Sequence, residues 1–216
     1  MSYEKRYNEI YAITALKYFW PRYQRGFIKW ESPDWYNISH DIGVEVSQAL
    51  LPKDGQEEKF ICSYLGKHKK QLPAEALARY GSRLYFYNDR FWALLQNEDD
   101  TISVEEKIRV RFQCKLKKLN KNYRNCETNT LYLFAHTEIE EAAAKAIAKE
   151  LCELQQDREY RFRMVFLDCK TRIYTMDLKN DIMKIIPIPE KAADFLREKT
   201  EQLRRELSDK PGTPYR

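Results

Sequence analysis

A short apolar run with an acid in its middle constrains the fold of this chain more than any other feature. Residues 42–46 read Ile-Gly-Val-Glu-Val, a pattern typical of a buried β-strand. A carboxylate in such a strand must be neutralised, paired or bound to something, because burying an isolated charge is costly. The fold therefore has to provide a partner for Glu45.

The segments on both sides of this run predict an α/β protein. Helix-forming residues extend from about residue 3 to residue 20, Pro21 ends them, and three short strands follow within residues 26–47. The later part predicts a helix over 104–123, a strand over 128–135, a helix over 138–156, two strands within 161–178 and a last helix over about 190–207. We expect one domain over residues 1–216, with a frayed tail after that helix.

An insertion over about residues 50–103 is harder to interpret. Residues 51–59 resemble a loop, and residues 74–81 predict a short helix ending at Gly81. Residues 83–87 and 90–95 fit either strands or a buried helix, because short apolar runs do not separate the two.

Composition and motifs exclude several classes of protein. The net charge of +5 comes from abundant charges of both signs, so the chain is no basic tail protein. Five cysteines without a C-x-x-C pair and three distant histidines argue against a disulfide framework and a zinc site. No G-x-S-x-G or P-loop motif is present. Without a signal-peptide core or a bilayer-spanning segment, we expect a cytoplasmic protein and no membrane partner.

The strands over residues 33–38 and 42–47 predict a hairpin with an acidic pair. If it is centred between Ser39 and His40, Asp34 lies opposite Glu45, with Cβ atoms about 5 Å apart. Mg²⁺ between the two carboxylates would remove their repulsion, since this ion needs only one or two protein ligands beside water. Gly43 leaves room beside Glu45 for a substrate or another backbone. Alternatively, Asp34 caps a turn after Pro33, and Glu45 points to solvent from an edge strand.

The run Pro33-Asp34-Trp35, followed by Ile-Gly-Val-Glu-Val-Ser, resembles the signature of the PD-(D/E)XK nuclease superfamily. The resemblance implies a restriction-endonuclease-like mixed β-sheet flanked by helices, in the order αβββαβ and then αββα. It also implies hydrolysis of phosphodiester bonds with Mg²⁺, or Mn²⁺ as a substitute, held by Asp34 and Glu45. The acid of the first helix, which helps to orient the metal water, matches Glu9; this residue could instead pair with Lys5 on the surface.

The sequence departs from the family pattern at one position. The family has a lysine two residues after the second acid, and this chain has Ser47 there. Either catalysis has been lost, or a lysine from another element reaches the site. Lys115 borders the apolar stripe of the helix over 104–123 and is the first candidate, with Lys118 as the second. Alternatively, both lysines belong to a solvated helix face.

The partner expected from this resemblance is nucleic acid, with DNA favoured over RNA. A basic strip would contact phosphates and comprises Lys117, Lys118, Lys121 and Arg124, and a second cluster lies at Lys67, Lys69 and Lys70. Analogy with the fold suggests a homodimer and a bacterial defence setting. Two alternatives stay open: a non-catalytic nuclease-like module that binds nucleic acid or protein, and an interaction protein with a Tyr-rich surface.

Overall fold

The computed structural model divides the chain into two compact units. The first comprises residues 1–49 and 108–216, and the second comprises residues 50–107. The structure describes residues 3–50, 56–57, 60–61, 63–94, 102–121 and 123–208, without the side chains of residues 3–6 and 207–208. The loop predicted over 51–59 and the predicted tail lie largely outside these ranges.

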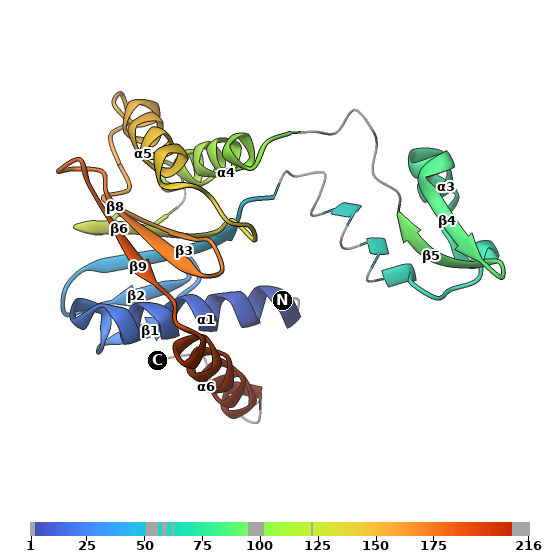
Figure 1. Ribbon diagram of the computed structural model, residues 1–216, viewed down its shortest axis with the longest axis horizontal. Helices are drawn as coiled ribbons and strands as arrows, with labels where there is room; N and C mark the ends of the chain where they lie inside the picture. The colour runs from blue at the N-terminus through green and yellow to red at the C-terminus, as the bar shows by residue number, and fades with distance from the viewer. Residues whose placement is uncertain are drawn as a thin grey trace. The chain divides into compact units, whose positions relative to one another are not determined.

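The first unit is an α/β structure built on a mixed seven-stranded sheet (Figure 1). The strand order is β1-β2-β3-β6-β7-β8-β9; β3, β6 and β7 run parallel, and the outer strands on each side are antiparallel. The strands are β1 (Phe27–Lys29), β2 (Trp35–Asn37), β3 (Ile42–Gln48), β6 (Thr128–Phe134), β7 (Met164–Asp168), β8 (Arg172–Asp177) and β9 (Ile182–Pro187). The helices are α1 (Tyr3–Phe19), α4 (Val104–Leu119), α5 (Glu141–Leu154) and α6 (Glu190–Ser208).

Helices cover both faces of this sheet. Alternate residues of β3, namely Ile42, Val44 and Val46, pack in one cluster with buried residues of α1 and α6. Figure 1 shows α4 and α5 on the opposite face. Because side chains alternate along a strand, Glu45 belongs to the face that α4 covers.

The register of the β2–β3 hairpin confirms the prediction. Trp35 pairs with Val44, Tyr36 with Gly43 and Asn37 with Ile42, so the numbers of paired residues sum to 79. Asp34 immediately precedes the first of these pairs. The hairpin therefore brings Asp34 and Glu45 to the same level of the sheet.

The predicted α/β class and most of the predicted elements are confirmed, with two corrections. Strand β9 was missed: its side chains are mostly exposed, and Lys184 interrupts its apolar residues, so it lacks the alternation of a half-buried strand. The helix predicted over 104–123 ends at Leu119, which leaves Tyr123 in the following loop.

The second unit has its own small core. It contains α3 (Ala74–Tyr80) and a two-stranded antiparallel sheet of β4 (Leu84–Tyr87) and β5 (Arg90–Leu94) (Figure 1). Both ambiguous apolar runs are thus strands, and the short helix before Gly81 is confirmed. The core comprises Phe60, Leu72, Ala76, Tyr80, Leu84 and Phe91.

Candidate functional site

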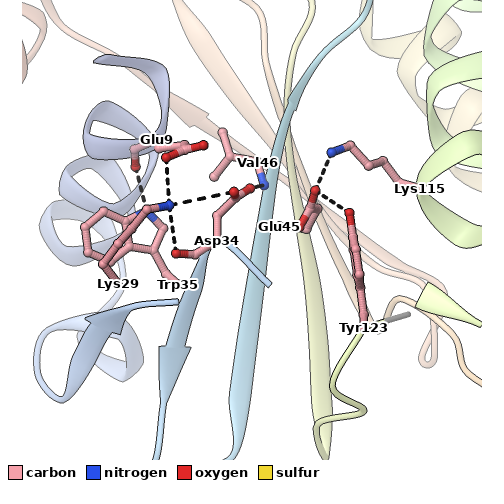
Figure 2. Close-up of polar contacts among 8 residues, drawn as sticks. All are labelled: Glu9, Lys29, Asp34, Trp35, Glu45, Val46, Lys115 and Tyr123. Atoms are coloured by element: carbon pink, nitrogen blue, oxygen red, sulfur yellow. Dashed lines mark hydrogen bonds and ion pairs between the residues drawn. The ribbon is translucent and has the colours of Figure 1, made fainter. Parts of the chain in front are cut away.

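Glu45 receives its partners from α4 and from the loop that follows this helix. Only 4% of Glu45 is exposed. The Lys115 ammonium group forms an ion pair with Glu45 Oε1, and the Tyr123 hydroxyl donates a hydrogen bond to the same oxygen at 2.7 Å. Figure 2 shows both side chains pointing to Glu45 from one side of β3. The lysine predicted to reach inward does so, while Lys118 is exposed.

Asp34 and Glu9 form a second cluster around Lys29. The Lys29 ammonium group lies 2.7 Å from Glu9 Oε2 and 3.7 Å from Asp34 Oδ1, and it donates a hydrogen bond to the Asp34 backbone carbonyl. Asp34 Oδ2 accepts a hydrogen bond of 2.8 Å from the backbone N–H of Val46. Lys29 therefore lies between the two acids, and Asp34 is tied directly to β3 (Figure 2).

The packing of Trp35 positions Glu9. The Trp35 indole N–H donates to the Glu9 backbone carbonyl at 2.9 Å, which fixes α1 against the β2–β3 hairpin. The same ring lies 5.3 Å from the Lys29 ammonium group, within the range of a cation–π contact. One aromatic side chain thus aligns a helix and a lysine with the acidic pair.

Burial raises the pKa values of both glutamates. For Glu9, the largest cause is loss of solvation, followed by the charge of Asp34, and Lys29 acts in the opposite direction. For Glu45, loss of solvation again raises the pKa, Lys115 lowers it, and the charge of Asp34 raises it. Asp34 thus raises the pKa of both glutamates, although their lysine partners differ, Lys29 for Glu9 and Lys115 for Glu45.

Sequence analysis identified four members of this arrangement and missed two. The structure places Glu9 of α1 and Asp34, just before β2, around Lys29, and it places Lys115 of α4 against Glu45 of β3. Sequence analysis did not identify Lys29 and Tyr123. Lys29 is paired with Trp35 in the sheet, and this pairing depends on the path of residues 30–34, which no local pattern predicts. A signal for Tyr123 was available, since it lies on the apolar stripe of the predicted helix.

The basic residues predicted to contact phosphates are exposed. This group comprises Lys117, Lys118, Lys121 and Arg124. The Arg124 guanidinium lies 4.4 Å from the centre of the Tyr36 ring, and its backbone N–H donates to the Ser32 carbonyl. Arg124 therefore lies against the acidic hairpin, whereas the three lysines extend the strip along α4 and the loop after it.

The two predicted magnesium ligands, Asp34 and Glu45, are carboxylates, which supply the oxygen donors that Mg²⁺ prefers. In the described part of the chain, no group of three or more His, Cys, Asp or Glu side chains is placed to hold a metal ion. Among the ion pairs of the described residues, the three buried carboxylates Glu9, Asp34 and Glu45 pair with Lys29 and Lys115. Mg²⁺ accepts one or two carboxylates with water as its other ligands. An ion held by Asp34 and Glu45 stays a prediction.

Comparisons with known proteins do not assign this chain to a family. No family model, no curated protein and no solved structure matches it. None of the helices in the described ranges is long and apolar enough to cross a membrane. The class that can be stated is an α/β protein whose mixed sheet carries buried acids paired with lysines.

Proposed function

We propose that this protein is a metal-dependent nuclease that hydrolyses phosphodiester bonds, with DNA as the favoured substrate. One observation carries the proposal: the side chain of Lys115 forms an ion pair with Glu45 across a long sequence separation. The family resemblance requires a lysine beside the second acid, and Ser47 cannot serve. Lys115 would supply the positive charge beside Glu45, the second acid of the motif.

The order of the surrounding elements supports the same proposal. Asp34 precedes a strand that is antiparallel to β3, and β6 follows α4 and runs parallel to β3. This order of a helix, three strands, a helix and a strand is the one that the resemblance implies. From this order and the acids of the hairpin we infer a restriction-endonuclease-like fold.

Each residue has a distinct task in the proposed reaction. Asp34 and Glu45 would hold Mg²⁺, which would supply Lewis-acid chemistry for the hydrolysis of a phosphodiester. Lys115 places a positive charge where negative charge develops in the transition state. Tyr123 fixes one oxygen of Glu45, and Glu9 acts through Lys29 to position Asp34.

The test is cleavage of plasmid DNA, single-stranded DNA and RNA in the presence of Mg²⁺ or Mn²⁺. Wild type is compared with Asp34→Ala, Glu45→Ala and Lys115→Met, and EDTA is added in a parallel series. We expect cleavage by the wild type, complete loss in EDTA and a loss of at least about 100-fold in each variant.

Lys145→Met is the matched control, because this exposed lysine of α5 pairs only with Glu141 in the described contacts. It should cleave like the wild type. An inactive wild type with either metal would overturn the proposal. Activity retained in Lys115→Met, with the metal requirement intact, would remove the lysine from the mechanism.

A second candidate is a non-catalytic module of the same fold. Its supporting observation is that Lys29 and Lys115 already neutralise much of the buried acidic charge, as expected of a structural network. This candidate predicts that the wild type binds nucleic acid and that Mn²⁺ binding, measured by calorimetry, is undetectable. The nuclease proposal predicts Mn²⁺ binding that Asp34→Ala abolishes.

A further inference from the structure

The second unit exposes three large aromatic side chains on one side of its small sheet. Tyr85, Tyr87 and Trp92 are 46%, 60% and 61% exposed. Phe86 and Phe91, their neighbours in sequence, instead pack in or against the core of the unit. Aromatic rings of this size are seldom left in water without a function, because each could bury a large apolar area.

A β-bulge brings the tryptophan to the tyrosines. Tyr85 pairs with Ala93 and Phe86 pairs with Phe91, so Trp92 is the extra residue between these pairs. Its ring centre lies 6.3 Å from that of Tyr87, with an angle of 59° between the rings. Bulges often redirect a side chain in this way, and here the result is an exposed aromatic surface formed by Tyr85, Tyr87 and Trp92.

A lysine-rich segment lies alongside β5, the strand that carries Trp92. The segment Gly66–Lys69 lies alongside β5, because Phe91 N donates to the Lys67 carbonyl and Gly66 N donates to the Phe91 carbonyl. This segment contains Lys67 and Lys69, and Lys70 follows it directly. Over residues 66–92 the sequence has six Lys or Arg residues and two Asp or Glu residues. Lys69 forms an ion pair with Asp89, and Arg83 forms one with Glu57, so the excess of positive charge in this range comes from Lys67, Lys70, Arg79 and Arg90. These four side chains are exposed, and their charge favours a polyanion.

We propose that the surface formed by Tyr85, Tyr87 and Trp92, with the adjacent basic segment, binds single-stranded DNA. Stacking of bases on aromatic rings needs unpaired bases, and lysine and arginine contacts follow the backbone phosphates. Duplex DNA hides its base faces, and a protein partner would not account for the excess of cations. Only the choice of DNA over RNA rests on the proposed nuclease function.

The experiment measures binding of a fluorescein-labelled oligo-dT to the full chain by anisotropy. EDTA is present, so the probe cannot be cleaved by a metal-dependent activity. Trp92→Ala should weaken binding roughly 10-fold and Trp92→Phe much less, because phenylalanine keeps a ring for stacking. Leu77→Ala, at an exposed apolar residue of the same unit, and Phe195→Ala, at an exposed ring of α6, should leave binding unchanged.

Several results would overturn this proposal. The first is that the wild type does not bind oligo-dT, and the second is that Trp92→Ala binds it as tightly as the wild type. The third is that Trp92→Ala lowers the affinity for a duplex of the same length as much as the affinity for oligo-dT. The fourth is that the protein binds only an RNA oligonucleotide. A change of oligomeric state in Trp92→Ala, seen by sedimentation without a change in DNA binding, would show a protein-docking surface. Cleavage is measured separately, so an inactive protein that still binds through Trp92 would refute only the nuclease proposal.

Discussion

At the scale of single residues, the site shows how buried charges are kept in a small α/β fold. Each glutamate has a lysine within contact distance, and Lys29 contacts both Glu9 and Asp34. A buried ion pair of this kind contributes little net stability, because desolvation offsets most of the attraction. Such a network is therefore better explained by what it does than by the stability that it adds.

The raised pKa of Glu9 predicts a pH-dependent difference between wild type and Glu9→Gln. A carboxyl group whose pKa is above its ordinary value of 4.5 binds a proton more tightly in the folded state. Its contribution to stability is complete below pH 4.5 and is lost as pH rises through the folded pKa. The free energy of unfolding of wild type, relative to Glu9→Gln, should fall with pH by at most about 1.4 kcal/mol per unit.

Urea unfolding followed by tryptophan fluorescence between pH 4.5 and 8 measures this difference. Glu141→Gln is the control, because this carboxylate is exposed on α5 and surface charges contribute little to stability. A difference that rises with pH above 4.5 would mean that Lys29 stabilises the ionised carboxylate more than burial destabilises it.

The residues that sequence analysis found and missed differ in a physical way. Asp34, Glu45 and Lys115 could be predicted because hairpin register and helical periodicity are local patterns. Lys29 could not, because its ammonium group reaches the acids only after β1 has paired with β2 and α1 has docked. Long-range contacts of this kind leave no spacing in the sequence.

At the scale of elements, the β2–β3 hairpin is held tightly against its neighbours at Gly43. A Cβ atom at this position would lie 2.8 Å from Pro33 Cγ and 2.9 Å from Cys126 Sγ. The small residue was expected to leave room for a substrate or another backbone. In the folded chain, side chains of Pro33 and Cys126 occupy that space.

We expect Gly43→Ala to destabilise the protein by roughly 1–3 kcal/mol, the usual cost of inserting a methyl group into a filled core. The reduced entropy of the unfolded chain offsets only about 0.4–1 kcal/mol of this. Urea unfolding measures the change. Adding Cys126→Ala should recover part of the loss, because it removes one of the two close contacts. Full wild-type stability in Gly43→Ala would mean that the hairpin can shift without cost.

At the scale of the whole molecule, the distribution of charge matters more than its sum. The net charge is only +5, yet four cations are gathered at the end of α4 and in the loop after it. One of them, Arg124, lies against the acidic hairpin. The insertion contains a second basic cluster, Lys67, Lys69 and Lys70, which is visible in the sequence alone. Its fold was unclear because short apolar runs fit both strands and helices, and the β4–β5 pairing resolves this.

The basic strip on α4 predicts the salt dependence of duplex binding. Each phosphate neutralised by a cation changes the slope of log K against log salt by about 0.9. Replacing all four cations with alanine should therefore reduce that slope by about 3, provided that most of them contact phosphates. The replaced residues are Lys117, Lys118, Lys121 and Arg124, and all four are exposed.

A matched variant distinguishes phosphate contacts made by this strip from a general attraction of DNA to a positively charged protein. It replaces four exposed lysines far along the chain from this strip, namely Lys145, Lys149, Lys179 and Lys184. Both variants lose the same formal charge, so an effect of net charge alone would change both slopes equally. Anisotropy titrations of a labelled duplex, in EDTA between 50 and 200 mM salt, give the slopes. A larger decrease in the α4 variant would place the phosphate contacts beside the acidic hairpin, whereas equal decreases would leave the strip an ordinary solvated helix face.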